Sequence, residues 1–243
     1  MANPAKALVA EFIGTFTLIF AGVLSISAAG IVGAPGTIAN LASIGLAHGL
    51  AIGVMVAALG SISGGHFNPA VTFGFVVTGR MPVARGIMYW IAQLLGGAAA
   101  GFLMVFMYGK TAVAGGTPDL GANVSMMSGI ITEAVGTFFL VLVVFGTAVD
   151  GRAPKSVYPF AIGLTIALDI MATGPLTGAA VNPARAFGPA IASGHFAHHL
   201  VYWIGPLIGG ALAALLQHHF LMDPEPAVDT AKVSGPTAQE ERK

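Results

Sequence analysis

The tripeptide Asn-Pro-Ala occurs twice in this sequence, and its residue types could form a polar binding point. The first copy begins at Asn68 in GGHFNPAVTFG, and the second begins at Asn182 in VNPARAFGPA. Asn caps the N-terminus of a helix with its side-chain oxygen, and Pro suits the first helical position. Each tripeptide therefore predicts a helix start that presents amide donors and the positive end of a helix dipole. Such a point would bind the oxygen of a neutral solute and repel cations.

The apolar stretch behind each tripeptide is too short to cross a membrane. Residues 68–79 and 182–192 would each reach roughly 15–18 Å, about half of a ~30 Å hydrocarbon core. The residues before them, 61–67 and 174–181, are rich in Gly and small polar residues. Non-helical backbone at membrane depth needs protein or a water-filled cavity around it. We therefore expect two re-entrant segments, each a loop followed by a half-length helix.

The elements around these segments have the composition of membrane spans. Of 243 residues, 56% are hydrophobic and 8% are charged, whereas soluble chains carry about 25% charged residues. The net charge is zero, which gives no sign of nucleic-acid binding, and no cysteine is present to form disulfides or thiolate metal sites. A spanning helix needs about 20 mostly apolar residues. Six stretches approach this length, at roughly 7–30, 38–60, 84–108, 127–149, 157–173 and 200–221.

The positions of Lys and Arg orient the chain. With six spans both termini lie on one side, and loops rich in Lys and Arg face the cytoplasm. Only Lys110 falls in a loop on the opposite side. We expect an integral multi-pass protein with both termini in the cytoplasm, and the short loops and tail favour a plasma (cell) membrane. The predicted cytoplasmic cations are Lys6, Arg80, Arg85, Arg152, Lys155, Lys232, Arg242 and Lys243.

The two halves of the chain also repeat each other. EFIGTF at residues 11–16 matches EAVGTF at 133–138, as the two Asn-Pro-Ala tripeptides match one another. Three spans per half would insert the second half upside down, and inverted repeats place their site at the midplane. We predict an all-α membrane protein with six transmembrane helices, two re-entrant half-helices and an inverted 3+3 repeat. Its parts are the first repeat at 1–115, the second at 116–222 and a mobile cytoplasmic tail at 223–243.

Together these features resemble the aquaporins, also called major intrinsic proteins. The resemblance covers nearly all of residues 7–221 and rests on the repeated Glu-x-x-Gly-Thr-Phe, on SGGHFNPAVTFG and on AAVNPARAFGPA. It implies a homotetramer with one pore per subunit, with Asn68 and Asn182 at the pore centre. It also implies that Glu11 and Glu133 brace the re-entrant loops by accepting backbone N–H bonds, which we favour over a proton relay. No cofactor is expected.

The resemblance further assigns a selectivity filter to four positions, which are His48, Ile170, Ala179 and Arg185 in this sequence. An arginine facing a narrow lumen offers fixed donors and repels cations. The alternatives are a buried ion pair for Arg185 and a packed core histidine for His48. Strict water channels of the family have Phe and then His at the first two positions. His followed by Ile therefore predicts a wider filter with one apolar wall.

This filter is similar to that of plant tonoplast intrinsic proteins, which pass water and, in several cases, ammonia, urea or hydrogen peroxide. The ammonia-passing members have a loop histidine that contacts the filter arginine, and the loop KTAVAGGTPDLGANVSMM has none. Ammonia conduction is therefore a hypothesis. Ala186 and the pair Tyr202-Trp203 differ from the residues that glycerol channels of the family carry there.

Several other polar residues have more than one interpretation. His66 would line the cytoplasmic vestibule or act as a packed loop histidine. Asp169 is interpreted as a hydrogen-bonded structural acid whose partner the sequence does not reveal. The histidines at 195, 198 and 199 are interpreted as solvated surface residues, and no metal site is predicted.

Three classes of function remain to be compared. A passive channel for water and small neutral solutes fits the two helix N-termini, which disfavour cations. A coupled secondary transporter, the alternative, also uses inverted repeats and broken helices but needs an ion site or carboxylates facing its substrate. An enzyme would need a nucleophile with its base, or metal ligands at depth, and we identify neither. The sequence therefore predicts a channel that excludes protons and ions, with water and small neutral solutes as its partners.

Overall fold

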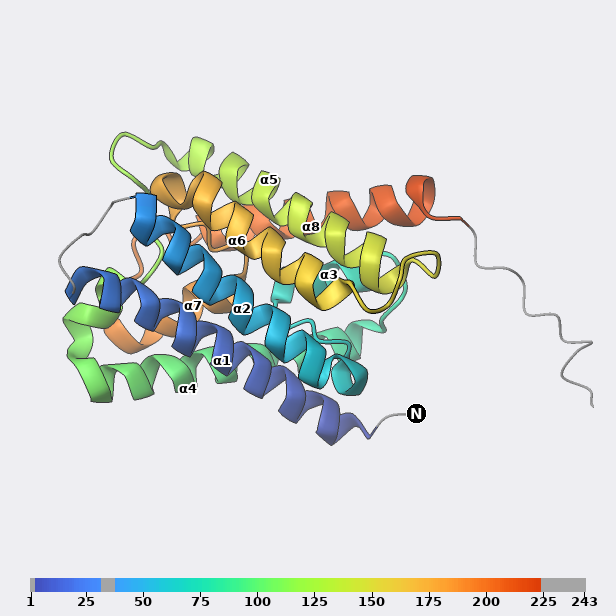
Figure 1. Ribbon diagram of the computed structural model, residues 1–243, viewed down its shortest axis with the longest axis horizontal. Coiled ribbons are helices and arrows are strands. Elements are labelled where there is room, and N and C mark those ends of the chain that lie inside the picture. Colours follow the sequence, from blue (N-terminus) through green and yellow to red (C-terminus); the bar gives the residue numbers. More distant parts are fainter. Residues whose placement is uncertain (1–2, 32–37, 224–243) are drawn as a thin grey trace, which may run out of the picture.

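The computed structural model describes residues 3–31 and 38–223. Within this part of the chain, six helices are long and apolar enough to cross a membrane. They run side by side along the longest dimension of the molecule (Figure 1). The six are α1 (Pro4–Ile31), α2 (Ile38–Ser63), α4 (Val83–Gly115), α5 (Met126–Val144), α6 (Tyr158–Thr177) and α8 (Val201–Leu216). Short π-helical turns, η1 (Phe145–Val149) and η2 (Gln217–Leu221), prolong α5 and α8. The predicted fold class is thus confirmed.

Two half-length helices complete the fold. They are α3 (Pro69–Val77) and α7 (Pro183–Ser193), with nine and 11 residues. Asn68 caps α3 by accepting from the Ala70 N–H, and Asn182 caps α7 by accepting from the Ala184 N–H. The predicted helix starts are therefore right, and Pro follows each cap because its missing N–H costs nothing there.

Two span boundaries differ from the sequence prediction by more than three residues. α6 continues to Thr177 rather than ending near residue 173, although Pro175 lies inside it, and it stops at Gly178 with φ +78°. α4 continues to Gly115 rather than residue 108, because helical geometry resumes after a break at Gly109. Glycine readily adopts the φ of +80° found at this break.

Close backbone contact joins helices from the two halves. A side chain at Gly49 of α2 would collide with the Gly163 carbonyl of α6, and one at Gly163 would collide with the Gly49 carbonyl. Gly188 of α7 lies equally close to the Gly97 carbonyl of α4. Helices associate in lipid through small residues of this kind, because lipid supplies no hydrophobic force between them.

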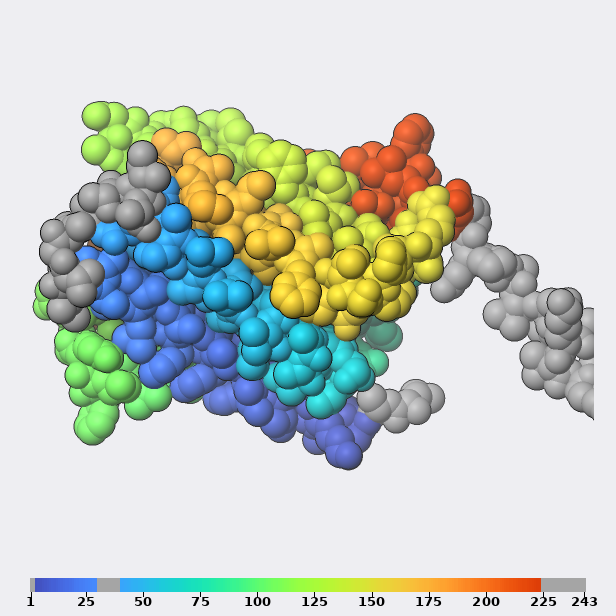
Figure 2. All heavy atoms as spheres, viewed as in Figure 1, coloured from blue at the N-terminus to red at the C-terminus, as the bar shows by residue number. Residues whose placement is uncertain are grey.

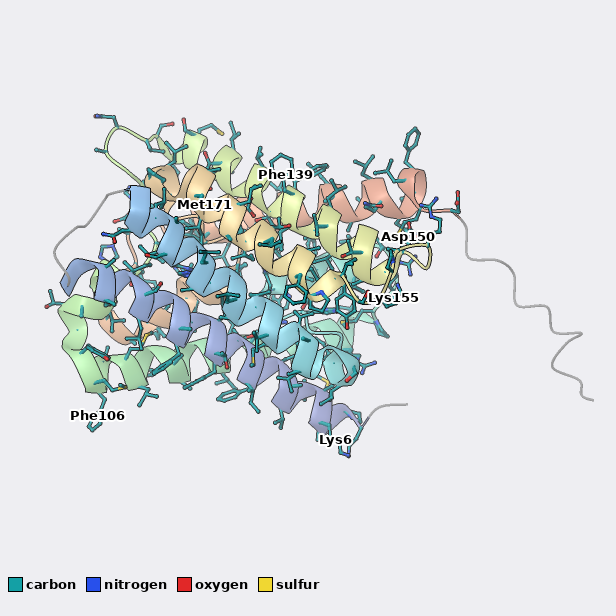
Figure 3. The ribbon with its side chains drawn as sticks, in the orientation of Figure 1. Lys6, Phe106, Phe139, Asp150, Lys155 and Met171 are labelled. Atoms are coloured by element: carbon teal, nitrogen blue, oxygen red, sulfur yellow. The ribbon has the colours of Figure 1, made fainter. Side chains whose placement is uncertain are left out.

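The ends and flanks of the bundle agree with a membrane position. α1 begins and α8 ends at the same end of the bundle (Figure 1), where the charged Lys6, Asp150 and Lys155 also lie (Figure 3). Phe106 and Phe139 project from the flanks (Figure 3), with exposed fractions of 88% and 45%. The predicted cations at 232, 242 and 243, and the tail from 224 onward, lie outside the described residues.

Candidate functional site

The two capping asparagines reach across to each other's segment at the centre of the bundle. The Asn68 Nδ2 donates to the Val181 carbonyl at 2.8 Å, and the Asn182 Nδ2 donates to the Phe67 carbonyl at 2.9 Å. Both asparagines are buried. A carboxamide has two N–H donors, so each asparagine fixes the opposite loop with one donor and keeps the second for a solute.

Glu11 braces the first re-entrant loop through both of its carboxylate oxygens. Its Oε1 accepts from the Ser63 hydroxyl at 2.6 Å and from the His66 N–H at 3.0 Å. Its Oε2 accepts from the Phe67 N–H at 2.7 Å and from the Gln93 Nε2 at 2.8 Å. Four donors thus surround a fully buried carboxylate, which satisfies its lone pairs without a lumenal contact.

Glu133 braces the second re-entrant loop in a similar way. Its Oε1 accepts from the Thr177 hydroxyl at 2.7 Å and from the Ala180 N–H at 2.9 Å. Its Oε2 accepts from the Val181 N–H at 2.7 Å. The Tyr202 hydroxyl then donates to the Thr177 carbonyl at 2.9 Å, so the base of the loop is also tied to α8.

The braced loops contain residues in the left-handed region of backbone space. Phe67 has φ +48°, Val181 has φ +43° and Ala179 has φ +44°. Side chains other than Gly seldom adopt such angles, which cost of order 1–3 kcal/mol. The bonds to the glutamates and between the loops offset this cost, and the strained backbone directs the loop N–H groups at the carboxylates.

A narrow cavity passes between the two asparagines. The space open to the centre of a water molecule is only about 20 Å³, and one water needs about 10–15 Å³ by this measure. Polar side chains interrupt a wall that is otherwise apolar. The cavity is lined by Leu18, His48, Ile52, Gly65, His66, Asn68, Val71, Leu140, Val144, Ile162, Ile166, Ile170, Ala179, Ala180, Asn182 and Arg185. It therefore brings together all the predicted pore-centre, filter and vestibule residues.

Arg185 carries the strongest polar group of this cavity. Its Nη1 lies 3.4 Å from the Gly116 carbonyl, and its Nη2 lies 3.5 Å from the His48 Nε2. Its Nε has no hydrogen-bond partner among the described residues. A guanidinium has five N–H donors, so each Nη atom keeps one N–H for a molecule in the cavity, and the fixed charge opposes cations.

The hydrogen bonds of His48 fix which of its ring nitrogens carries the proton. Its Nδ1 lies 2.9 Å from the Ile44 carbonyl, which only accepts. The neutral ring therefore carries its proton on Nδ1, and its Nε2 accepts from Arg185. A side chain at Gly22 of α1 would overlap this imidazole. Sequence reasoning missed Gly22, since an isolated glycine in a span gives no functional signal.

Ile170 and Ala179 add apolar side chains to the wall of this cavity. Both are buried, at 3% and 2% exposure, and both line the cavity. Ala179 adds only a methyl group to the wall. The four positions predicted for the filter therefore offer donors on Arg185, an acceptor on His48 and no polar side chain at Ile170 or Ala179.

His66 combines the two interpretations that the sequence left open. It lines the cavity, and its ring also packs against Phe75 with the ring centroids 4.3 Å apart. Its Nδ1 lies 3.1 Å from the Thr72 hydroxyl, which also accepts from the Gln93 Nε2. Gln93 and Thr72 were missed because neither belongs to a repeated motif.

The outer histidines are less free than the sequence suggested. Asp119 lies 3.0 Å from the His195 Nε2 and 2.8 Å from the His198 Nδ1, through different carboxylate oxygens. His199 accepts a bond from the Trp203 Nε1 at 3.2 Å. In the part of the chain that the structure describes, no group of three or more such side chains is arranged to hold a metal.

Asp169 lies beside the cavity but does not line it. Its carboxyl group is buried against Gly136 of α5, and its Oδ2 has no partner among the described residues. The partner expected for a structural acid is therefore not found for this oxygen.

Comparisons with known proteins agree on one family. The sequence profile of the family described as Major intrinsic protein matches residues 1–217. The chain is similar to aquaporin TIP2-1 of Arabidopsis thaliana, with 44% identity over 89% of this chain and 88% of that protein. It is also similar to aquaporin TIP4-4 of Zea mays, with 44% identity over 93% of this chain and 92% of that protein.

A solved structure shares the fold. The aquaglyceroporin from Plasmodium falciparum superimposes with a TM-score of 0.80, over 90% of this chain and 97% of that chain. The two sequences are 23% identical, so this likeness concerns the architecture alone.

Proposed function

The chain belongs to the major intrinsic protein family, and on that premise we propose that its filter passes ammonia, hydrogen peroxide and urea as well as water. Membership makes it a multi-pass membrane water channel of the aquaporin type rather than an enzyme. The observation that supports a wider solute range is the absence of a Phe, Tyr or Trp side chain from the described cavity lining, so no such ring narrows it.

The polar groups of the cavity suit neutral molecules that both donate and accept. Asn68 and Asn182 offer N–H donors at the centre, where the N-termini of α3 and α7 add two positive dipole ends. A water molecule there would turn its oxygen toward the donors, which interrupts the chain of bonds that a proton needs. Arg185 adds a full positive charge at the filter, so protons and metal cations are excluded twice.

Small solutes other than water would use the same donors and acceptor. The lone pair of ammonia, or an oxygen of urea or peroxide, would accept from Arg185, and an N–H or O–H would donate to the His48 Nε2 in place of its 3.5 Å contact with Arg185. Ile170 and Ala179 leave the other walls smooth and apolar. A strict water filter would instead place an aromatic ring here and exclude solutes by size.

The coupled transporter gains no support from the site. Such a transporter needs carboxylates or carbonyls that bind a coupling ion. The carboxylates of Glu11 and Glu133 accept four and three donors from the protein, respectively, and neither lines the cavity.

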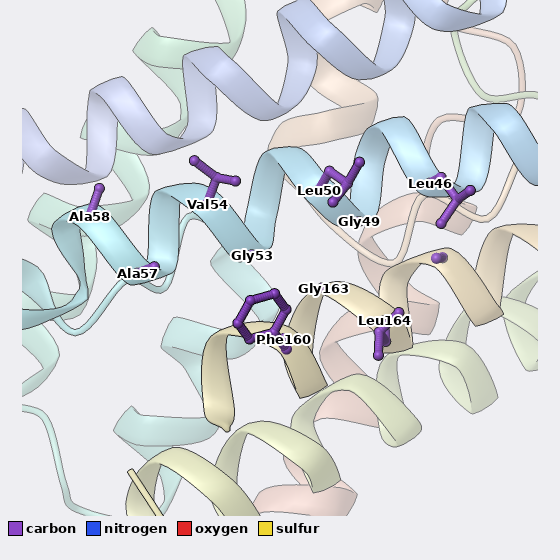
Figure 4. Close-up of a pocket in the computed structure, with 11 residues that line it drawn as sticks. Leu46, Gly49, Leu50, Gly53, Val54, Ala57, Ala58, Phe160, Gly163 and Leu164 are labelled. Carbon is purple, nitrogen blue, oxygen red and sulfur yellow. The ribbon is translucent and has the colours of Figure 1, made fainter. Parts of the chain in front are cut away.

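The implied homotetramer fits the flanks of the bundle. Figure 2 shows the face formed by α1, α2, α5 and α6, and a groove of about 400 Å³ runs between α2 and α6 (Figure 4). Glycine and alanine form its floor, with Leu46, Leu50, Phe160 and Leu164 beside them. Small-residue surfaces favour contact with another helix in lipid. Native mass spectrometry in detergent should show four copies, and a monomer would contradict this part of the proposal.

Two membranes are candidates for the location of this protein. The short loops favour the plasma membrane, whereas the resemblance to tonoplast intrinsic proteins favours the vacuolar membrane. A fluorescent fusion in the native cell would distinguish the two.

Proteoliposomes test the solute range directly. We expect osmotic shrinkage in stopped-flow to be fast, and ammonia, peroxide and urea uptake to exceed that of empty liposomes. No uptake should saturate or depend on an ion gradient, since either behaviour would favour a transporter. Water flux with no other solute flux would restrict the protein to water.

A further inference from the structure

The loop between α4 and α5 contacts the second re-entrant segment close to the filter. Its Gly116 carbonyl accepts from the filter residue Arg185 at 3.4 Å. Its Gly121 N–H donates to the Leu176 carbonyl at 2.8 Å. Residues 116–121 therefore connect the wall of the filter to the backbone just before it.

Asp119 ties the middle of this loop to the segment that follows α7. Its Oδ2 lies 3.0 Å from the His195 Nε2, and its Oδ1 lies 2.8 Å from the His198 Nδ1. The Leu120 N–H also donates to Oδ1, at 2.7 Å. We call Asp119, His195 and His198 the Asp119 cluster, and it uses both oxygens of one carboxylate.

Few other titratable groups face this cluster in the described part of the chain. The Tyr202 hydroxyl of α8 feels the charge of Asp119, but it donates to the Thr177 carbonyl. His199 accepts from Trp203. Neither group competes with the two histidines for the carboxylate.

The charge state of Asp119 supports a contact that survives mild acid. Partial burial would raise the pKa of Asp119, but the bonds from His198, the Leu120 N–H and His195 together lower it below its usual range. A lowered pKa means that the stabilisation is present above the unfolded pKa, about 4, and is lost as pH falls through the folded value. Either histidine donates to the carboxylate whether its ring is neutral or protonated.

We propose that Asp119, bound to His195 and His198, is a positioning residue for the filter, acting through the Gly116 carbonyl on Arg185. The inference rests on the proposed function in one respect, that Arg185 forms the filter. The guanidinium has only two hydrogen bonds to protein among the described residues, at 3.4 and 3.5 Å. Such long contacts are weak, so the position of Arg185 depends on how firmly residues 116–121 are held.

Release of the loop should widen the filter rather than block it. Without the Asp119 cluster, the Gly116 carbonyl moves and Arg185 keeps only His48. The guanidinium then occupies more positions across the lumen. The permeability of a solute larger than water should therefore increase more than the permeability of water.

The test compares Asp119→Ala and Asp119→Asn with wild type in proteoliposomes at pH 8 and pH 5. The readout is the ratio of urea to water permeability. We expect Asp119→Ala to raise this ratio about threefold or more at both pH values, the equivalent of one weak hydrogen bond. Asp223→Ala, which removes an exposed carboxylate on the helix end opposite the filter, should leave the ratio unchanged.

The conservative variant Asp119→Asn separates positioning from a general structural role. The carboxamide that it introduces keeps one acceptor oxygen and adds an N–H donor, so it can still bond to the two histidines and the ratio should stay near wild type. Wild type should hold its ratio at both pH values.

Two outcomes would overturn the inference. One is an unchanged ratio in Asp119→Ala while water still passes, even if its thermal stability falls. The other is an Asp119→Asn ratio that rises as much as the ratio of Asp119→Ala. If wild type passes no urea or ammonia, the wide filter is wrong, yet a rise in Asp119→Ala would still support the positioning role.

Discussion

Each re-entrant loop is hydrogen-bonded to a buried glutamate, yet the side chains that the two loops place in the cavity wall differ. Glu11 and Glu133 each receive the two N–H groups that precede an Asn-Pro-Ala tripeptide. Tyr89 and Tyr202 each donate to the carbonyl of the hydroxyl residue at the base of the loop. The hydrogen bonds that hold the loop backbone are thus nearly the same in both halves, and we call this set of bonds the frame.

The side chains on that frame are not repeated. Three residues beyond Asn68 lies Val71, and three beyond Asn182 lies Arg185, although both line the cavity. Gly65 stands three residues before the first asparagine, where Ala179 stands before the second. The comparison teaches that the frame places the two asparagines, while side chains that differ between the halves, such as Arg185, supply the filter that we propose.

Removal of either glutamate should have the largest effect. Glu133→Ala leaves three buried donors unpaired and Glu11→Ala leaves four, at about 1–3 kcal/mol per group. We expect both variants to lose folded protein, measured by thermal unfolding in detergent. Glu11→Gln and Glu133→Gln keep one acceptor oxygen and should lose less. A severe loss in one half with none in the other would contradict a shared frame.

Arg185→Val makes the second half resemble the first and should abolish selectivity. Without the guanidinium the filter loses its donors and its charge. Urea flux should therefore rise about tenfold, which corresponds to a barrier lower by about 1.4 kcal/mol. Cation leak should appear in the same liposomes. Val71→Ala is the matched control, and it should alter neither measurement. Unchanged selectivity in Arg185→Val would remove Arg185 from the filter.

Gln93→Leu should have a smaller effect on stability. It reduces the donors on Glu11 from four to three, the number that Glu133 has, and it also removes the bond from Gln93 to the Thr72 hydroxyl. The bond to the carboxylate alone is worth about 1.5–3 kcal/mol, so we expect a loss of at least this size. The melting temperature should fall while water permeability per folded channel stays the same. A loss of water permeability would show that Gln93 also acts on the lumen.

Exchange of the small residues should produce the smallest effect. Gly65 has φ +66° and Ala179 has φ +44°, so Gly65→Ala introduces strain and Ala179→Gly removes it. We expect a loss of about 1 kcal/mol for the first and a change near zero for the second, because Gly adds entropy to the unfolded chain. Equal and opposite shifts in melting temperature would contradict this prediction, because they would show that backbone strain outweighs the entropy that Gly adds to the unfolded chain.

The sequence predicted the frame better than the filter contacts. Capping asparagines, prolines and long apolar stretches act locally, so α3, α7 and the six spans could be located without a structure. Gly22, Gln93 and Asp119 could not be found this way, since their partners lie 26, 82 and 76 residues away. Such contacts depend on how helices pack, which local pattern does not specify.

The double variant His48→Phe with Ile170→His tests most directly whether these filter positions decide what passes. It installs the aromatic ring and the histidine that strict water channels carry. Ammonia and water permeability should be measured in the same proteoliposomes, with wild type as reference. The account predicts that water flux persists while ammonia flux falls to that of empty liposomes. Undiminished ammonia flux alongside normal water flux would contradict it.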